Sequence, residues 1–324
     1  MPVDFLTPEQ EEKYGCFCDT PTSEQLAKYF WLDDTDNELI WNRRGEHNQL
    51  GFAVQLGTVR FLGTFLSDPT NVPQSVITYM ANQLHLDAQS FSCYRNKRSQ
   101  WDQMQEIRSV YGYKNFTDKS THWRFIRWLY ARAWLYNERP SVLFDLATAR
   151  CIEQKILLPG VSVLTRLVST VRDRSAENIW KKLSSLSDNV QKKQLENLLQ
   201  IDQKTKKTYL ERLSNPPVTI SVTGIKNTLI RLQELRQLNT ENWDMSRIPS
   251  KRLQQFARHT VAVRAQAIAR MPDQRRMAML VAFAKMYTQS AQDDVIDIFD
   301  RYLTDLFAKT YRKEQKERFV QLRI

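Results

Sequence analysis

The sequence predicts an all-α fold, on three observations. Ser, Thr or Asp followed three residues later by Glu or Gln, the signature of a capped helix start, recurs along the chain. Apolar residues repeat at three- and four-residue spacing over most of its length. The one strand-like run, residues 218–222, follows two prolines, and an isolated strand is marginal without a partner. We therefore interpret that run as the edge of a linker.

The expected helices follow from these signals in chain order. Two short helices open at the capping boxes of Thr7 and Thr22, and a third covers residues 34–41. The fourth, residues 46–63, is apolar on more than one side and should be central. Its glycines, spaced six residues apart, would let neighbouring elements approach closely: Gly51, Gly57 and Gly63. Further helices are expected at 73–85, 98–111, 119–136, 140–156 and 162–184, within 187–207, and from Ser250 onward, with two more after Pro272.

Two of these helices are expected to bury aromatic faces. The apolar residues that recur at helical spacing are Trp101, Met104, Ile107 and Tyr111 in one, and Trp123, Ile126, Tyr130 and Trp134 in the next.

Composition bounds the class of protein. The 324 residues are 42% hydrophobic and 11% aromatic, which excludes intrinsic disorder and predicts two or three subdomains. No apolar run reaches the length of about 18 residues that a membrane helix needs, and the acidic start lacks the features of a secretory signal. Four scattered cysteines do not make a disulfide framework. We expect a soluble, cytoplasmic protein with reduced thiols and no membrane partner.

The net charge of +11 favours anionic partners. Residues 1–40 hold ten acidic and two basic side chains, whereas basic side chains outnumber acidic ones twelve to six in residues 41–137. The basic excess therefore lies entirely after residue 40, an asymmetry that favours nucleic-acid binding.

Familiar catalytic motifs are missing. Neither a Gly-Lys-Ser/Thr phosphate loop nor a dinucleotide fingerprint occurs, and the cysteines and histidines lack zinc-ligand spacing. Acids at 33–36 are explained as helix caps, and those at 293–300 as a solvated helix face. We expect no enzyme active site, and no cofactor, in this chain.

Four basic patches carry the chemistry that is present. The first three lie at expected helix starts, where free N–H groups and the helix dipole favour phosphate. Their candidate DNA-binding residues are Arg43, Arg44, His47 and Asn48; Arg95, Lys97, Arg98, Ser99 and Gln100; and Lys119, Ser120, His122, Arg124 and Arg127. For the first patch, an arginine pair that simply solvates a turn is an equal alternative.

The fourth patch has the spacing of a helix-turn-helix. A helix ending at Leu157, the turn Leu158-Pro159-Gly160 and a following helix would present one polar face outward and pack one apolar face inward. The outward residues are Ser162, Thr165, Arg166 and Ser169, and the inward ones are Leu164, Leu167 and Val168. An ordinary helical hairpin is the alternative.

Several strings together resemble transposases of the Tn3 family of replicative bacterial transposons. They are Arg43 to Leu56, Arg60 to Gly63, Val72-Pro73, Ile156 to Gly160 with Leu164 and Arg166 to Val168, and Arg275 to Phe283 with Asp293-Asp294. The resemblance spans nearly the whole chain. It implies the amino-terminal part of a longer protein that recognises the terminal inverted repeats of a transposon. The catalytic acidic triad and its divalent metal, Mg²⁺ by expectation, would then lie in a domain downstream.

We therefore expect two helical DNA-binding subdomains, residues 1–140 and 141–240, and a helical connector, residues 241–324. Arginines and lysines at helix starts would neutralise phosphates, while Arg98, Gln100, Thr165 and Arg166 would read base edges of double-stranded DNA. The full-length protein could self-associate, and it would lie at the bacterial nucleoid when bound. The rival function is a basic helical scaffold that binds acidic proteins and not DNA.

Overall fold

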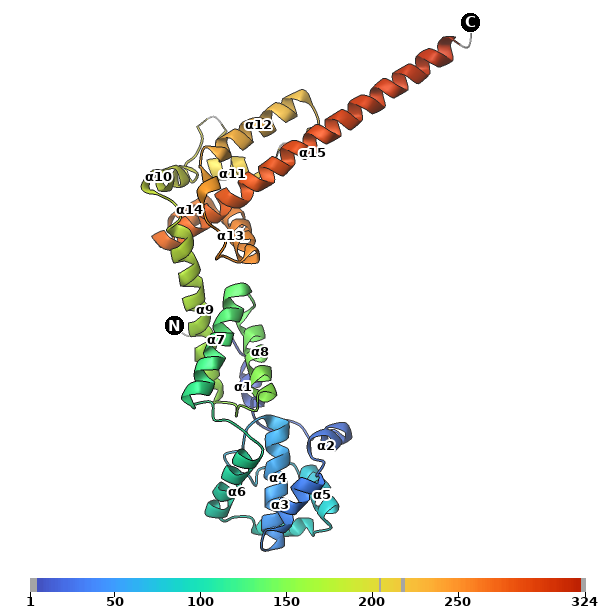
Figure 1. Cartoon of the computed structure of the whole chain (residues 1–324), viewed down its shortest axis with the longest axis vertical. Helices are drawn as coiled ribbons and strands as arrows, with labels where there is room; N and C mark the ends of the chain where they lie inside the picture. The colour runs from blue at the N-terminus through green and yellow to red at the C-terminus, as the bar shows by residue number, and fades with distance from the viewer. Residues whose placement is uncertain (1–4, 204, 217–218, 322–324) are drawn as a thin grey trace. The chain divides into compact units, whose positions relative to one another are not determined.

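The computed structural model describes residues 5–203, 205–216 and 219–321, with all their side chains except those of Lys97 and residues 316–321. Within these ranges every regular element is a helix (Figure 1), which confirms the all-α class. The only β-type pairings seen there are two isolated bridges, Lys114 with Ile156 and Ile201 with Thr208. Val218, the first residue of the strand-like run, and Pro217 before it lie outside the described residues, and the chain is helical from Val222.

The chain divides into two compact units. Unit 1 comprises the residues up to Ala133 together with Glu138–Arg172, and unit 2 comprises Trp134–Asn137 and the residues from Asp173 onward. The boundary falls inside a helix, Val161–Ser184. The division into three subdomains stays a prediction.

Unit 1 opens with six α-helices and one 3-10 helix. They are α1 (Pro8–Lys13), α2 (Ser23–Tyr29), α3 (Asp34–Trp41), α4 (Glu46–Leu62), α5 (Gln74–Leu84), η1 (Ala88–Cys93) and α6 (Lys97–Val110). The predicted capping boxes at Thr7 and Thr22 are both present, and a third caps α3 at Asp33. Since each box satisfies two otherwise unpaired N–H groups, these short helices start where the sequence placed them.

Helix α4 is the core of this part, as predicted. Its residues from Leu50 to Val59 are all buried, and α2, α3, α5, η1 and α6 pack around it. A Cβ at Gly51 would lie 2.3 Å from the Tyr94 ring, and one at Gly57 would lie 2.3 Å from the Phe30 ring. Close approach is therefore what these two glycines provide.

The rest of unit 1 is a group of three helices with its own core. Helices α7 (Lys119–Leu135), α8 (Pro140–Glu153) and α9 (Val161–Ser184) meet through buried side chains such as Leu129, Phe144 and Leu164. Two backbone hydrogen bonds tie the connection after α8 to earlier parts of unit 1. Lys114 N–H, between α6 and α7, donates to Lys155 O at 2.8 Å, and Leu158 N–H donates to the O of Gly63, the C-cap of α4, at 3.0 Å.

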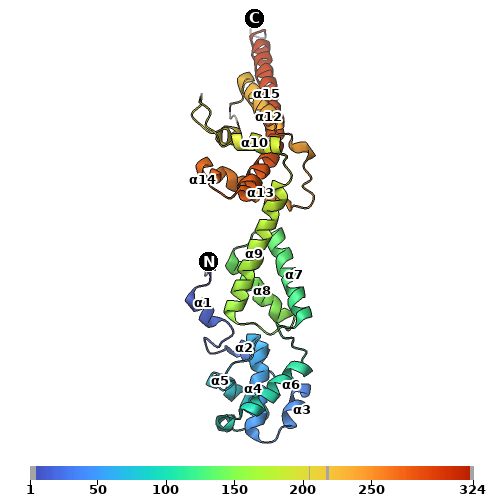
Figure 2. The same cartoon turned by 90° about the vertical axis from the view of Figure 1, so that its left-hand side faces the viewer.

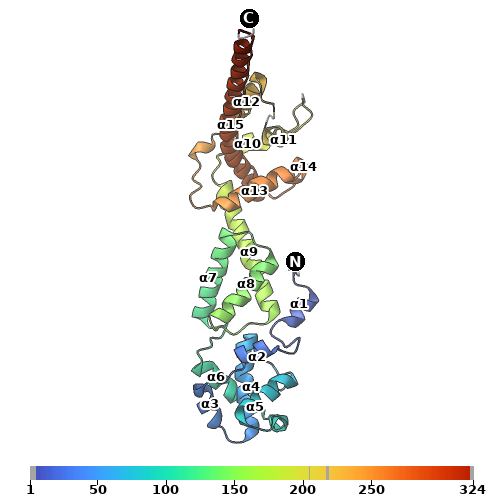
Figure 3. The ribbon, with the colours of Figure 1, turned by 90° about the vertical axis from the view of Figure 1, so that its right-hand side faces the viewer.

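Unit 2 is organised by one long helix, α15 (Asp273–Gln321), against which α12 (Val222–Arg236) and α13 (Ser250–Ala262) pack (Figures 2 and 3). The other elements are α10 (Asn189–Asn197), α11 (Tyr209–Ser214), η2 (Thr240–Asn242) and α14 (Ala265–Ala269). The α15 residues from Met277 to Ala284 are buried in its core. Buried Arg231 of α12 donates to Asp294 of α15 at 2.5 Å, so this acid is not part of a solvated face.

Two expectations about helices were wrong, one about where a helix ends and one about the number of helices, and two further helices were missed. Helix α8 stops at Glu153, because Lys155 adopts a left-handed φ of 52° and Ile156 N–H returns to Cys151 O at 2.8 Å. A left-handed residue at this position usually ends a helix, and it is usually glycine. Because the residue here is lysine, the sequence does not show where the helix ends. After Pro272 there is one helix and not two, since no Gly or Pro interrupts residues 273–321. Helices α11 and α12 were not predicted.

Candidate nucleic-acid interface

The two arginines in the turn before α4 lie in different environments. Gly45, with φ of 83°, is the N-cap of α4 and reverses the chain. Arg43 turns inward: its guanidinium donates to the Glu106 carboxylate of α6, its Nε donates to Leu39 O at 3.2 Å, and it lies 4.6 Å from the Phe52 ring centre. Arg43 therefore holds the turn against α6.

The other residues of this first patch lie nearer the surface. Arg44 is exposed, and its carbonyl accepts from the Asn48 side-chain amide at 2.9 Å. His47 is half-buried, with its ring beside Gly45. The patch thus presents one exposed guanidinium at the start of α4, not two.

The second patch rests on a buried polar network. The Tyr94 hydroxyl accepts from Gln55 Nε2 at 2.6 Å and donates to Gln103 Oε1 at 2.6 Å. Burial raises the pKa of this phenol, although the hydrogen bond from Gln55 acts to lower it. The Gln100 amide donates to Tyr94 O at 2.9 Å. Because its N–H group is used inside the protein, Gln100 positions the start of α6 in this structure.

Cations surround that network on the outside. Arg95 and Arg98 are exposed, Ser99 is half-buried, and the side chain of Lys97 lies outside the described residues. Arg95 Nε donates to Ser92 O at 3.0 Å. Beside them a groove of about 670 Å³ runs between α6 and residues 66–70, and Trp101 forms part of its wall.

The third patch occupies the first two turns of α7. Lys119, Ser120, Arg124 and Arg127 are all exposed. His122 differs, because its ring packs edge-on against Phe116 at 5.1 Å and its Nδ1 is buried. His122 therefore anchors the helix start, and the other four face solvent.

The fourth patch, at the start of α9, is only partly as predicted. Ser162 and Arg166 are exposed and Ser169 is half-buried, but Thr165 is buried, so its predicted outward orientation is wrong. The Thr165 hydroxyl donates to Val161 O at 2.7 Å, within its own helix. Thr165 follows Leu164 in the sequence, and both are buried in α9. The tight three-residue turn is also absent, because the connection runs from Gln154 to Gly160.

Two tryptophans predicted to be core residues are exposed. Trp101 is 57% exposed and Trp123 is 62% exposed. Helix α6 buries Ile107, as expected, and α7 buries Leu129, which was not in the expected set. Helical spacing alone placed them on the apolar face. Trp101 stands between Gln100 and Asp102, and Trp123 stands between His122 and Arg124. These polar neighbours are the available signal in the sequence that both rings face outward.

The exposed cations of unit 1 are not used in its ion pairs. Arginines that do pair in this unit are Arg43 with Glu106, Arg60 with Asp36, Arg132 with Glu138 and Arg150 with Glu153. None of the ion pairs found among the described residues includes the exposed candidates Arg44, Arg95, Arg98, Lys119, Arg124, Arg127 and Arg166. Unit 1 thus presents exposed cations that these ion pairs do not use near the starts of four helices.

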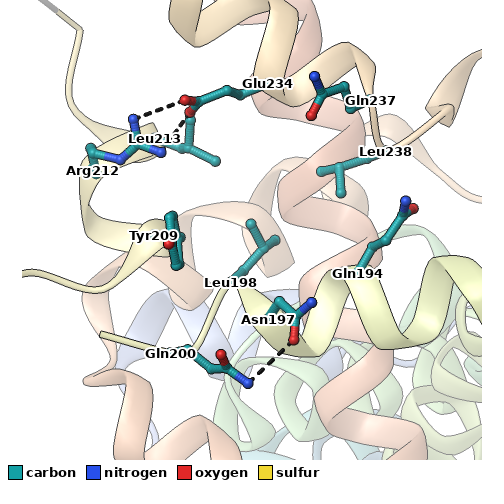
Figure 4. Close-up of a pocket in the computed structure, with 10 residues that line it drawn as sticks. All are labelled: Gln194, Asn197, Leu198, Gln200, Tyr209, Arg212, Leu213, Glu234, Gln237 and Leu238. Atoms are coloured by element: carbon teal, nitrogen blue, oxygen red, sulfur yellow. Dashed lines mark hydrogen bonds and ion pairs between the residues drawn. The ribbon is translucent and has the colours of Figure 1, made fainter. Parts of the chain in front are cut away.

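A pocket of about 380 Å³ in unit 2 has different chemistry (Figure 4). Its cation, Arg212, is 2.7 Å from the Glu234 carboxylate, and the Gln200 amide donates to Asn197 at 3.2 Å. Its polar groups therefore bind one another, and the pocket offers no free charge comparable to that of unit 1.

The described residues contain no cluster of three or more His, Cys, Asp or Glu side chains that could hold a metal ion. Among them there is likewise no helix with the length and apolar character needed to cross a membrane.

The described residues define an all-helical protein whose first unit carries exposed cations near the starts of four helices. A family model described as a domain of unknown function, DUF4158, matches residues 5–171, which coincides with unit 1. The transposase for transposon gamma-delta of Escherichia coli (strain K12) is 40% identical over 325 residues, covering all of this chain and 32% of that protein. The transposase for transposon Tn1546 of Enterococcus faecium is 30% identical over 97% of the chain and 32% of its own length.

A third relative, the transposase for transposon Tn501 of Pseudomonas aeruginosa, is 26% identical over 91% of the chain and 30% of its own length. The chain belongs to the Tn3-family transposases and carries their DUF4158 domain. It spans about a third of the length of the curated relatives it matches.

Proposed function

We propose that this chain is the amino-terminal, DNA-addressing part of a Tn3-family transposase, and that it binds double-stranded DNA at the terminal inverted repeats of a transposon. The observation that carries the proposal is the set of exposed, unpaired cations at the starts of α4, α6, α7 and α9 in unit 1. Cations at helix starts add to the pull of the free N–H groups on phosphate. The transposase relatives support the same assignment.

The cations would share two tasks. Arg44, Arg95, Lys119 and Arg124 would neutralise phosphates and set the register of the protein on the duplex. Arg98 and Arg166, one near the start of α6 and one in the second turn of α9, would reach base edges, where a guanidinium pairs with guanine through two hydrogen bonds. Arg43 and Gln100 would act indirectly, by holding the turn before α4 and the start of α6.

Catalysis would belong to a part of the transposase outside this chain. The Tn3-family resemblance implies a divalent metal, Mg²⁺, for the whole protein. The described carboxylates do not fit such a site, since no three potential ligands cluster and Asp36, the most buried acid, is taken by Arg60 and Tyr111. We therefore derive no step through a metal from these residues. In the bacterial cytoplasm the protein would meet its DNA at the nucleoid, and the full-length transposase could self-associate there.

Hydroxyl-radical footprinting of the 324-residue chain on a labelled transposon end tests the proposal. Binding by unit 1 predicts protection confined to the terminal repeat and absent from flanking DNA at the same protein concentration. A basic scaffold for acidic proteins predicts no bounded footprint. Replacing Arg98 and Arg166 together with Gln should remove the boundary, while Arg139→Gln, an exposed arginine outside the four patches, should preserve it.

A further inference from the structure

Helix α7 carries one exposed face that its helical partners leave open. Ser120, Trp123, Arg124 and Arg127 are all exposed, and their spacing of three, four and seven residues places them on one side of the helix. The opposite side, including Phe125, Leu129 and Ala133, is buried in the core of the three-helix group. The open face therefore combines two guanidinium groups with an indole that is 62% exposed.

The Lys, Arg, Asp and Glu side chains of helix α7 itself carry charge of one sign. From Lys119 to Leu135, helix α7 contains four basic side chains and no acidic one. The ion pair of Arg132 with Glu138 lies at the far end of the helix. Such a face is complementary to a polyanion. A ligand that binds it must therefore carry negative charge and also an apolar group against which the exposed indole can pack.

Unit 1 contains a matched indole in the opposite setting. Trp31 is also 62% exposed, but it precedes Asp33 and Asp34 at the start of α3. Exposure of a tryptophan is thus not by itself a sign of a binding surface. What distinguishes Trp123 is its place between cations, one turn after the start of its helix. The major groove of DNA is wide enough to admit such a helix.

We propose that α7 enters the major groove and that the Trp123 indole covers thymine methyl groups there, so that Trp123 helps to read sequence. The edges of base pairs in the major groove are polar except for the thymine methyl, which is the apolar group that a ring held among base edges can bury. Arg124 and Arg127 flank the ring and reach the phosphates on either side. The inference rests on the proposed DNA-binding function and adds the residue and the base feature it recognises.

Fluorescence anisotropy with a duplex carrying the transposon end tests it, with Trp123→Gln and the control Trp31→Gln. Trp123→Gln should weaken cognate binding about tenfold. Its salt dependence should be unchanged, because no charge is lost. Trp31→Gln should bind like the unmodified chain. Because the two tryptophans are equally exposed, the melting temperatures of both variants should match that of the parent.

Thymines of the repeat are then replaced one at a time by deoxyuridine, which lacks the methyl group. At the contacted positions the parent should lose about fourfold in affinity, the value of one buried methyl-sized group, and Trp123→Gln should lose nothing further. Equal losses in both proteins, or no loss in either, would overturn the inference while leaving terminal-repeat binding intact.

The proposed function fails separately, since a parent chain that binds cognate and shuffled duplexes equally would defeat it before any variant is made. Vesicles containing anionic lipid serve as a competitor in the same titration. Displacement of the duplex by vesicles from the parent, but not from Trp123→Gln, would assign this face to membranes and overturn the inference as well.

Discussion

Arg43 in the turn before α4 donates its guanidinium to the carboxylate of Glu106 in α6, while the adjacent Arg44 is exposed. The pair closes α6 onto the core helix at the point where Asn48 O also accepts from the Gln103 amide at 3.2 Å. Arg43 thus stabilises the fold, and Arg44 is available to a ligand.

Separate replacement of these arginines should separate the two roles. Arg43→Ala should lower the free energy of unfolding by about 1 to 3 kcal/mol, because the half-buried Glu106 loses its charged hydrogen bond. Arg44→Ala should leave stability unchanged, weaken binding to all duplexes and reduce the salt slope by about 1. Urea unfolding and anisotropy measure the two effects. Glu106→Gln should reproduce the first effect alone; a DNA defect without a stability defect in Arg43→Ala would contradict this division.

The buried carboxylate of Asp36 predicts a sensitivity to acid. Burial acts to raise its pKa, but hydrogen bonds from Arg60 at 2.8 Å and from Tyr111 outweigh this and hold the pKa below its ordinary value of 3.8. A pKa lowered by folding contributes stability above the unfolded value of about 3.9 that is lost as the pH falls through the folded pKa.

Asp36→Asn should therefore lower stability at pH 7 by about 2 to 4 kcal/mol, between the value of a charged hydrogen bond and that of a broken buried pair. Its stability should also change less than that of the parent as the pH falls below about 4. Chemical denaturation at pH 3 to 7 measures both quantities. Parallel pH profiles for the two proteins would show that Asp36 does not govern acid unfolding.

Glycine spacing in α4 predicts a steric effect. A Cβ at Gly57 would lie 2.3 Å from Phe30 and 2.6 Å from the Met80 methyl, so Gly57→Ala should destabilise the protein by about 1 to 3 kcal/mol, despite the better helix propensity of alanine. A Cβ at Gly160 would meet nothing within 4 Å, and Gly160→Ala is the matched control that should keep or raise the melting temperature. Equal melting temperatures for the two variants would argue against close packing at Gly57.

Substitutions of exposed Arg166 and of its buried neighbour Thr165 should have different effects on DNA recognition by α9. Arg166→Ala should weaken cognate binding by about 1 to 3 kcal/mol and leave random duplex nearly unaffected. Thr165→Val keeps the buried shape but removes the hydroxyl, so it should preserve DNA discrimination. Anisotropy with cognate and random duplexes measures this. Equal loss on both duplexes for Arg166→Ala would refute its base-reading role.

Local signals predicted the fold well where a cap or a breaker is visible. The capping boxes at Thr7 and Thr22 and the burial of α4 needed no information beyond neighbouring residues. The end of α8 was missed because Lys155 takes a left-handed conformation that only tertiary hydrogen bonds reveal. Helix α11 has a capping box at Thr208 with Glu211, so its start is visible in the sequence.

The candidate site was harder to predict, because residue type does not say which way a side chain points. Arg43 and Gln100 have the chemistry of DNA contacts, yet the structure uses them in internal hydrogen bonds. Trp123 has the chemistry of a core residue, yet it is exposed. Whether a side chain meets solvent depends on partners up to 63 residues away in the chain, as with Glu106 for Arg43. No periodicity within one helix contains that information.

The most direct test of the central claim is fluorescence anisotropy of the chain with a duplex carrying the transposon end and with a shuffled duplex of equal composition, across a salt series. Recognition of the terminal repeat predicts that the cognate duplex binds more tightly than the shuffled one by more than about a hundredfold, and that this ratio of affinities persists as salt rises. Equal affinities that fall together with salt would reveal a basic surface without sequence recognition and would contradict the account.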